Sequence, residues 1–234
     1  MHNEGLIIIP TFNEVENLLY IYNRVRKVTK EDILFVDDGS IDGTVEKILD
    51  LAKSDPRVKM LLRNSKEGLG KAYQAAFHYA MQEDYDFIIH LDADGSHEVE
   101  KIPDLIRGYK SGFDLVVGSR YVKGGTVDNW SVVRRIISKV GNNYARFVLG
   151  LEIKDLTSGF RLYSLSKLQS AHLERATARG YAFQVQMTYL FNGFKILEVP
   201  IRFKDRTFGV SKMGYGIILE ALVQIPSIRL KGKQ

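Results

Sequence analysis

Over its first 120 residues, the chain alternates short, almost uninterrupted apolar runs with longer amphipathic segments. Short apolar runs of this kind are typical of strands whose two faces are both buried. Strands that alternate with helices form a parallel sheet covered by helices. We therefore expect an α/β fold with a mostly parallel central sheet flanked by helices. The predicted strands are Leu6–Ile9, Ile33–Val36, Val58–Leu62, Phe87–Leu91 and Leu115–Val117, and the predicted helices are Val15–Val28, Gly43–Ala52, Gly68–Gln82 and Val99–Tyr109.

The pattern loosens after residue 120, but nothing in the sequence marks a domain boundary there. A helix is expected from Trp130 onward, another near Tyr181–Asn192, and a strand near Lys195–Val199. There is no Pro- or Ser-rich linker, internal repeat or low-complexity tract. We expect a single domain over residues 1–213, with a first half at about 1–120 and a second half at about 121–213, followed by a C-terminal segment at 214–234.

Composition excludes several kinds of site. The chain has no cysteine, which excludes disulfides, thiolate nucleophiles and cysteine metal sites and is compatible with a cytosolic protein. No stretch reaches the roughly 18 uncharged apolar residues that a membrane span requires. We therefore expect a chain that does not cross a bilayer.

The net charge of +5 lies entirely in the last forty residues. Residues 1–194 hold 25 Lys and Arg against 25 Asp and Glu, whereas residues 195–234 hold eight against three. A basic end indicates an anionic partner, such as a phosphate, a membrane surface or a nucleic acid. A solubilising tail explains the charge alone equally well.

Ligands of a parallel sheet bind beyond the carboxyl ends of its strands. The segments that follow four of the predicted strands are Pro10–Glu14, Asp37–Ser40, Asp92–Ser96 and Gly118–Tyr121. Three of the four carry carboxylates. We expect these carboxylates to converge on one edge of the sheet.

Asp92 and Asp94 are the central feature of this edge. Two carboxylates two residues apart, at the end of an apolar strand, can turn toward one cation, and carboxylate oxygens suit Mg²⁺ or Mn²⁺. Asp37 and Asp38 are expected nearby, where four carboxylates without a counter-ion are costly. The sequence therefore predicts a site for Mg²⁺ or Mn²⁺, with a pair of solvated loop aspartates as the alternative.

A second group of candidate residues is basic. Arginine matches phosphate oxygens in bidentate geometry, and lysine supplies a point charge. The segment Arg206–Lys212 has the glycine and hydroxyl spacing of a flexible loop that grips phosphate. The group consists of Arg120, Arg134, Arg135, Arg206 and Lys212.

Two familiar phosphate-binding motifs are absent or incomplete. No Gly-x-Gly-x-x-Gly follows the first strand, where Pro10 and Thr11 stand instead. The segment Lys66–Ala72 resembles a phosphate loop, but it lacks the upstream glycine and the Ser or Thr after the lysine. We expect this segment to begin a helix.

Six motifs that occur in order give the chain a specific resemblance. They are Pro10-Thr-Phe-Asn-Glu14, Val36-Asp-Asp-Gly-Ser40 with Asp42-Gly-Thr44, Asp92-Ala-Asp94 with Ser96-His97, Gly118-Ser-Arg120-Tyr, Ser158-Gly-Phe160 and Arg206–Lys212. With these motifs the chain resembles the family 2 glycosyltransferases, and within them the dolichyl- and polyprenyl-phosphate mannose synthases, over nearly its whole length. The resemblance implies a GT-A-type nucleotide-sugar-binding fold. The Gln-x-x-Arg-Trp signature of processive polysaccharide synthases is absent, which favours a single transfer.

The resemblance also implies a role for individual residues. Nucleotide-sugar binding falls to Pro10, Phe12, Glu14, Val36, Asp38, Asp92, Ala93, Asp94, Ser96, Arg120, Arg206 and Lys212. Metal binding falls to Asp92, Asp94 and Ser96, and catalysis through the donor diphosphate and acceptor phosphate falls to Asp94, Arg120, Arg134, Ser138, Arg206 and Lys212. Phe12 stands where many relatives have tyrosine, and Ser96 where others have glutamine. A water-mediated contact from Ser96 to the metal is therefore favoured over a direct one.

The implied reaction transfers mannose from GDP-mannose to a polyprenyl or dolichyl monophosphate with inversion. The implied cofactor is Mg²⁺ or Mn²⁺, and Asp155 is a further candidate for orienting the acceptor or the sugar. The alternatives are transfer of another sugar, with UDP-glucose as donor, a phosphohydrolase with an aspartyl nucleophile, and an inactive nucleotide-sugar-binding or membrane-binding module. A transferase for another sugar would have similar nucleotide-binding loops. The phosphohydrolase alternative rests on the resemblance of Asp92–Ser96 to a haloacid-dehalogenase motif.

A lipid acceptor implies a membrane surface as partner, with no nucleic acid, and a peripheral position on the cytoplasmic face. Residues Ile217, Ile218, Ala221, Leu222 and Ile225 form one helical stripe, which Pro226 is expected to end and basic residues follow. We expect this amphipathic, basic segment to lie on the membrane. The alternatives are that the helix packs on the protein's own core, or that a separate subunit or missing segment provides the anchor.

Overall fold

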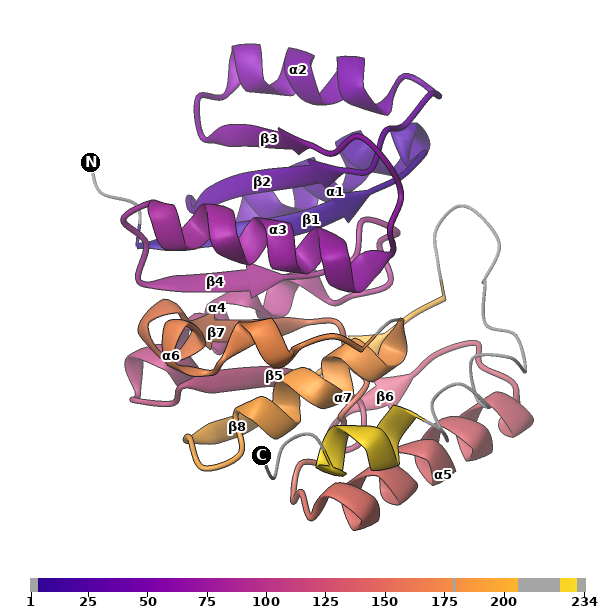
Figure 1. The fold of residues 1–234 in the computed structure, drawn as a ribbon. Helices are drawn as coiled ribbons and strands as arrows, with labels where there is room; N and C mark the ends of the chain where they lie inside the picture. The colour runs from indigo at the N-terminus through magenta and orange to yellow at the C-terminus, as the bar shows by residue number, and fades with distance from the viewer. Residues whose placement is uncertain (1–3, 179, 206–223, 231–234) are drawn as a thin grey trace.

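The computed structural model describes residues 4–178, 180–205 and 224–230, and its centre is a seven-stranded sheet (Figure 1). The strand order is β3-β2-β1-β4-β7-β5-β8. Every neighbouring pair in this sheet is parallel except those that β7 makes with β4 and β5. The strands are β1 (Gly5–Thr11), β2 (Asp32–Asp37), β3 (Val58–Leu62), β4 (Phe87–His90), β5 (Leu115–Ser119), β7 (Arg161–Ser164) and β8 (Ile196–Pro200). A small second sheet pairs β6 (Thr126–Val127) with β9 (Arg202–Phe203).

Helices cover both faces of the large sheet. The helices are α1 (Val15–Val28), α2 (Thr44–Ser54), α3 (Leu69–Gln82), α4 (Ile102–Lys110), α5 (Val132–Leu149), α6 (Leu165–Ser170) and α7 (Tyr181–Leu190), with short 3-10 turns at Val99–Lys101 and Leu173–Arg175. Helices α1, α2 and α4 share one apolar core with the sheet, and α3, α6 and α7 share the other. Helix α5 lies beside the sheet, at the opposite end of the molecule from α2 (Figure 1).

The first strand shows why these apolar runs form a sheet between two layers. Residues Leu6, Ile7, Ile8 and Ile9 are all fully buried. Leu6 and Ile8 belong to the core on the α3 side, whereas Ile7 and Ile9 belong to the core on the α1 side. Successive side chains of a strand point to opposite faces, so an uninterrupted apolar run supplies both cores.

The expected α/β architecture is therefore confirmed, and the elements predicted in the first half are present within a few residues of their predicted ends. The sequence did not predict β7, which is fully buried between β4 and β5. This strand is only four residues long and begins with Arg161, so it carries no apolar run. Through β7, the second half of the chain completes the sheet that the first half begins.

Helix α5 begins and ends with the capping residues that such a helix requires. The hydroxyl of Ser131 accepts a hydrogen bond from the backbone amide of Arg134, and Gly150 ends the helix with a φ of 69°. Ala145 and Leu149 pack in a third apolar cluster with Ile225 and Ile228. One face of α5 is therefore anchored on the protein.

The C-terminal prediction is corrected where the structure describes it. Residues 224–230 are helical, so Pro226 does not end the helix. Ile225, predicted to face a membrane, is 3% exposed and packs on the protein's own core. Ile225 packs inward because Ala145 and Leu149 of α5 lie in the same apolar cluster. The remainder of the predicted stripe, Ile217–Leu222, lies outside the described residues. Within the described ranges, no helix has the length and apolar character needed to span a bilayer.

Candidate active site

The carboxyl ends of β1, β2, β4 and β5 meet at one edge of the sheet, together with the segment that leads into β7. Strand β1 lies between β2 and β4, both parallel to it. The chain leaves β1 toward one side for β2 and returns on its other side as β4. Such a switch in strand order opens a crevice for a ligand, and the segments Pro10–Glu14 and Asp92–Ser96 flank it.

Asp37 closes the turn after β2. Its carboxylate is fully buried and accepts hydrogen bonds from the hydroxyls of Thr11, at 2.8 Å, and Ser40, at 2.7 Å. The backbone amides of Gly39 and Ser40 donate to the same carboxylate at 3.0 and 2.7 Å. Gly39 has a φ of 80°, a conformation that other residues rarely adopt. Asp37 is thus a structural residue that shapes the loop.

Asp38 faces an arginine, Arg63, that was not among the predicted site residues. A guanidinium nitrogen of Arg63 lies 2.6 Å from a carboxylate oxygen of Asp38. Burial raises the pKa of Asp38 more than the charge of Arg63 lowers it. Arg63 follows β3 directly, so the rule that singled out the other loops applies to this one as well. Asp37 is thus held by four donors and Asp38 has Arg63 as its counter-ion, so the charge of these two carboxylates does not require a metal ion.

Four further residues predicted to hold the nucleotide lie in β1, in the loop that follows it, or in β2: Pro10, Phe12, Glu14 and Val36. Phe12 is half-buried, and the ammonium group of Lys66 lies 3.8 Å from the centre of its ring. Glu14 accepts a hydrogen bond from the amide of Asn17 at 2.7 Å. Val36 is fully buried in the core, and Pro10 lies at the end of β1. Lys66 lies just before α3, which begins at Leu69 as expected. The N-cap residue of this helix is Gly68, with a φ of 98°.

Asp92 and Asp94 lie in the loop after β4 in different surroundings. The Asp92 side chain is 36% exposed, with an oxygen 3.3 Å from Nε2 of the buried His97. Asp94 is 7% exposed, and its Oδ1 accepts from the amide of Ser96, at 3.0 Å, and from its hydroxyl, at 2.6 Å. Ala93, between them, is 4% exposed. The structure thus brings the two predicted carboxylates to the crevice, with Ser96 holding Asp94.

These residues fit a divalent cation that is shared with a substrate. Mg²⁺ and Mn²⁺ are commonly bound by one or two carboxylates, and water and substrate phosphates complete the coordination. In the described part of the chain, no group of three or more His, Asp or Glu is arranged to hold a metal alone. The donor set of Asp92 and Asp94 is therefore suited to a metal–diphosphate site rather than to a closed metal site.

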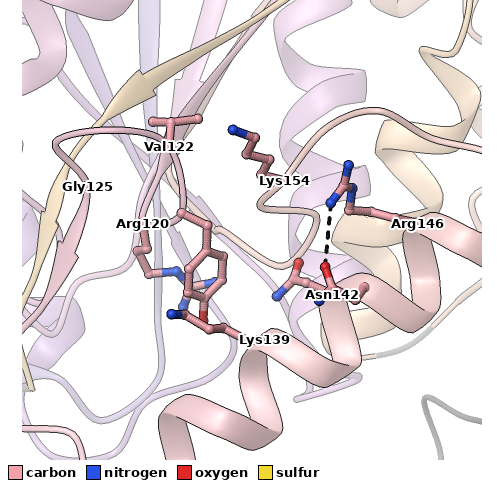
Figure 2. A pocket seen from close by; sticks show the side chains of 9 residues that line it. Arg120, Val122, Gly125, Lys139, Asn142, Arg146 and Lys154 are labelled. Carbon is pink, nitrogen blue, oxygen red and sulfur yellow. Dashed lines mark hydrogen bonds between the residues drawn. The ribbon is translucent and has the colours of Figure 1, made fainter.

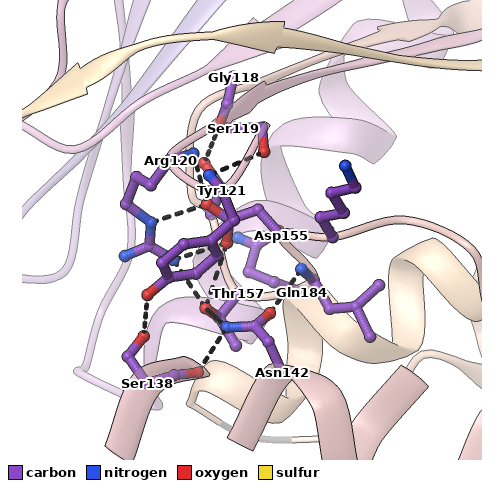
Figure 3. Close-up of polar contacts among 12 residues, drawn as sticks. Gly118, Ser119, Arg120, Tyr121, Ser138, Asn142, Asp155, Thr157 and Gln184 are labelled. Atoms are coloured by element: carbon purple, nitrogen blue, oxygen red, sulfur yellow. Dashed lines mark hydrogen bonds and ion pairs between the residues drawn. The ribbon is translucent and has the colours of Figure 1, made fainter. Parts of the chain in front are cut away.

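Arg120 is held by a carboxylate from the loop before β7 (Figure 3). Its Nε and Nη2 donate to the two oxygens of Asp155 at 2.7 and 2.6 Å, and its backbone amide donates to Asp155 at 2.9 Å. Nη2 also donates to the hydroxyl of Thr157 at 2.8 Å. Burial alone would raise the pKa of Asp155, but the charge and hydrogen bonds of Arg120 hold it below its ordinary value. Arg120, predicted to hold phosphate, is thus engaged in a buried ion pair.

A second polar network links the segment after β5 to α5. The hydroxyl of Tyr121 donates to the hydroxyl of Ser138 at 2.6 Å, and burial raises the pKa of Tyr121. The amide of Asn142 donates to the carbonyl oxygen of Ser138, and its oxygen accepts from the backbone amide of Leu156. Neither Tyr121 nor Asn142 was predicted as a site residue. Tyr121 bonds to a residue 17 positions away, and Asn142 joins Ser138, one turn earlier on α5, to Leu156 in the loop before β7.

Arg134 lies four residues before Ser138 on α5, as expected. Its guanidinium lies 4.0 Å from the centre of the Trp130 ring, and Nη1 lies 2.8 Å from a carboxylate oxygen of Asp205. Arg135, beside it, is exposed and donates to the carbonyl oxygen of Val127. Arg206 and Lys212 lie outside the described residues.

Comparisons with known proteins identify the family of the chain. The family model described as glycosyl transferase family 2 matches residues 6–170. A polyprenol monophosphomannose synthase of Mycolicibacterium smegmatis is 44% identical over 97% of this chain and 88% of its own length. An undecaprenyl-phosphate mannosyltransferase of Micrococcus luteus is 44% identical over 94% of this chain and 91% of its own length.

Two solved structures extend the comparison to the fold. Glucosyl-3-phosphoglycerate synthase from Mycobacterium tuberculosis, in complex with Mn²⁺, UDP and glucosyl-3-phosphoglycerate, matches 98% of this chain and 79% of its own, with a TM-score of 0.67 and 15% identity. A mannosyltransferase from Pyrobaculum calidifontis, in complex with GDP-Man and Mn²⁺, matches 100% of this chain and 64% of its own, with a TM-score of 0.61 and 13% identity. The expected GT-A-type fold is therefore confirmed.

Proposed function

The chain belongs to glycosyl transferase family 2, and we propose that it transfers mannose from GDP-mannose to a polyprenyl monophosphate. The observation that carries the proposal is 44% identity, over nearly the whole chain, to two enzymes named for this product or acceptor. Family membership also argues against the aspartyl-phosphohydrolase alternative. In that alternative, the strand before Asp92 would open the fold, whereas here three strands precede it along the chain.

The acceptor decides what the site must do. A phosphate monoester has a second pKa near 6, so most of it is already a dianion at neutral pH and needs no general base. The protein's task is to bring this anion against the anomeric carbon of a donor that is also anionic, and to hold the two in line. A single displacement inverts the anomeric centre, so an α-linked donor gives a β-linked product.

The donor half supplies the binding of the nucleotide diphosphate. We assign Phe12, Asp38 and Arg63 to the binding of the base and ribose. We assign Asp92 and Asp94 to the binding of the divalent cation, Mg²⁺ or Mn²⁺. When bound, the cation neutralises the diphosphate leaving group. Ser96 fixes the orientation of Asp94 through two hydrogen bonds to Oδ1. The hydroxyl of Ser96 thus positions a ligand, in keeping with an indirect contact to the metal.

The acceptor half supplies cations. Arg134 and Ser138 lie on one side of α5, and we assign them to the acceptor phosphate, together with Arg206 and Lys212. Arg120 is already paired with Asp155, so we assign it the role of joining the end of β5 to the loop before β7. We assign Asp155 an indirect role on the acceptor side, in which it holds Arg120 in place.

A panel of labelled nucleotide sugars tests the proposal. The purified chain is incubated with polyprenyl phosphate and Mn²⁺ or Mg²⁺, and the label is followed into the lipid phase. Mannose from GDP-mannose is expected to enter the lipid with release of GDP. Transfer of glucose from UDP-glucose in its place would contradict the assigned sugar, and absence of any transfer would indicate an inactive binding module.

A lipid acceptor places the site at a membrane surface, on the cytoplasmic face where nucleotide sugars are available, with no part for nucleic acid. Attachment of the protein to the membrane is assigned to the basic segment 214–234, to a separate membrane-anchoring subunit, or to both. Sedimentation of the chain with vesicles, with and without residues 214–234, measures the contribution of that segment.

A further inference from the structure

Strand β9 joins the two sides of the crevice. On one edge, the amide of Arg202 donates to the carboxylate of Glu98 at 2.6 Å, and the amide of Lys204, just after the strand, donates to the carbonyl oxygen of Ser96 at 3.0 Å. The other edge pairs with β6, the strand that leads to α5. This short strand therefore lies between α5 and the loop of residues 92–98, which we call the donor loop.

The ring of Phe203, in β9, contacts a residue from each side of the crevice. Its centre lies 5.3 Å from the centre of the His97 ring and 5.6 Å from the centre of the Trp130 ring, both in edge-to-face geometry. The Cζ atom of Arg120 lies 5.3 Å from the same centre. Aromatic pairs and cation–π contacts at such distances favour particular orientations of the side chains. One ring thus packs against the donor loop, the residue before the cap of α5 and the buried ion pair of Arg120.

On the donor side, Phe203 packs against a part of the loop that is held in place by other contacts. His97 is 2% exposed, and its Nε2 lies 3.3 Å from a carboxylate oxygen of Asp92. The same loop contains the two hydrogen bonds from Ser96 to Asp94. Because these bonds are local, the donor loop does not depend on Phe203 for its shape.

On the acceptor side, the first half of α5 is held by few contacts. None of residues 132–141 is buried, and the buried residues of the helix begin at Asn142. A cavity of about 310 Å³ lies beside the middle of the helix, and its lining includes Lys139 from α5 and Arg120 from the segment after β5 (Figure 2). Because this half of the helix is loosely packed, the place of Arg134 depends mainly on the contacts of its own side chain.

Two groups hold the guanidinium of Arg134, and both involve β9 or the residues next to it. A carboxylate oxygen of Asp205, two residues after Phe203, lies 2.8 Å from Nη1. The centre of the Trp130 ring, which packs against Phe203, lies 4.0 Å from Cζ. Trp130 is 6% exposed, so the face on which the guanidinium lies is itself fixed by packing. Arg134 is thus tied to the same short segment, residues 202–205, that is bonded to the donor loop.

We propose that Phe203 is a positioning residue, which acts through Trp130 to set the place of Arg134 relative to the donor loop. In-line displacement requires the reacting atoms to be about 3–3.5 Å apart, and a misplacement of about 1 Å can lower the rate about a hundredfold. Loss of the ring would shift the loosely packed start of α5 and leave the donor loop in place. This role rests on the proposed function, because it takes Arg134 as a ligand of the acceptor phosphate.

Kinetics and calorimetry of the full chain test this role. Phe203→Leu removes the ring and keeps an apolar side chain, and it is expected to lower kcat/KM for a short, water-soluble polyprenyl phosphate at least about tenfold. The affinity for GDP in the presence of Mn²⁺ should be unchanged. Phe194→Leu is the matched control, because Phe194 is also partly buried and packs against one aromatic ring, that of Phe191, and near one cation, Lys167. Both values should be unchanged in the control.

A double-mutant cycle separates a positioning role from a merely structural one. In the Arg134→Ala background, Phe203→Leu should lower kcat/KM by no more than about twofold, because the group that it positions is already absent. Additive losses, or an equal loss of GDP affinity in Phe203→Leu, would overturn the proposal. If Phe203→Leu does not fold, Asp205→Asn removes the other contact between this segment and Arg134 without opening a cavity, and the same selective loss and the same cycle are expected.

A binding measurement keeps this test separate from the proposed function. If the unchanged chain transfers no sugar to a polyprenyl phosphate, the proposed function fails. Calorimetry with the short polyprenyl phosphate, in the presence of GDP and Mn²⁺, then decides the role of Phe203. Its affinity should fall in Phe203→Leu as it does in Arg134→Ala, and an unchanged affinity in either variant would overturn the positioning role.

Discussion

The two sides of the crevice hold their charged groups in different ways. On the donor side, Asp37 and Asp94 are bound by amides and hydroxyls two or three residues further along the chain, with one longer contact from Thr11 to Asp37. On the acceptor side, Arg120 is bound by a carboxylate 35 residues away, and Arg134 by one 71 residues away.

The difference follows from the chemistry of the two ligands. The donor loops must keep carboxylates turned toward a metal, and tight turns with short polar side chains do this locally. The acceptor side must place cations, whose long side chains need partners from other elements to fix them. We therefore expect substitutions at Asp92 and Asp94 to affect chemistry with little effect on stability, and substitutions at Arg120 and Asp155 to affect both.

Asp94→Asn carries the largest expected effect. The amide keeps an oxygen to accept from Ser96, but the carboxylate charge that a metal requires is lost. Transfer is expected to fall by about a thousandfold or more, which corresponds to roughly 4 kcal/mol of barrier, with an unchanged unfolding midpoint. Metal-dependent GDP binding, measured by calorimetry, should be lost in parallel. Asp50→Asn, on the surface of α2, is the control. If Asp94→Asn retains a tenth of the activity or more, Asp94 is not a metal ligand.

Asp155→Asn tests the buried ion pair. It leaves the Arg120 guanidinium buried without its counter-charge, and we expect a loss of about 3–5 kcal/mol in the free energy of unfolding. The pKa of Asp155 is lowered in the folded state, so its stabilisation is complete above the unfolded pKa of about 3.9 and is lost as the pH falls below that value.

Urea unfolding of both proteins across the pH range checks this. The difference between them should be constant at neutral pH and should shrink below about pH 4. A difference that grows on acidification would show that Asp155 is not stabilised as an anion. Arg120→Met together with Asp155→Leu should restore part of the stability, because both buried charges are removed.

Arg134→Ala separates the two sides of the crevice. We expect the KM for polyprenyl phosphate to rise about tenfold or more, since one charge-assisted contact to a phosphate is lost. Binding of GDP-mannose, measured by calorimetry, should be unchanged. Arg135→Ala removes the neighbouring exposed arginine and serves as the control. If Arg134→Ala loses affinity for the donor to the same extent, Arg134 binds the donor diphosphate and not the acceptor phosphate.

Tyr121→Phe carries the smallest expected effect. It removes the hydrogen bond to Ser138 and leaves the ring in place. The free energy of unfolding should fall by about 0.5–1.5 kcal/mol, and the KM for the acceptor should rise a few-fold, because Ser138 is no longer oriented. If stability falls but the acceptor KM does not change, Ser138 has only a structural role.

The sequence by itself determined the parts of this protein that depend on local order. Short apolar runs such as Leu6–Ile9 and Ile33–Val36, separated by amphipathic segments, predict buried parallel strands, because a strand that is buried on both faces carries apolar residues at every position. The rule that ligands meet the carboxyl ends of strands then points to Asp92 and Asp94. The same rule would have identified Arg63 if the third loop had been included.

Only the tertiary structure decided what each charged group faces. Arg120 has the composition of a phosphate ligand, but the antiparallel entry of β7 brings Asp155 against it. Ile225 has the pattern of a membrane-facing residue, but it packs against α5. Within the described residues, an apolar face stays exposed on α5. Periodicity predicts that a helix has an apolar side, whereas the packing of distant segments decides whether that side is covered.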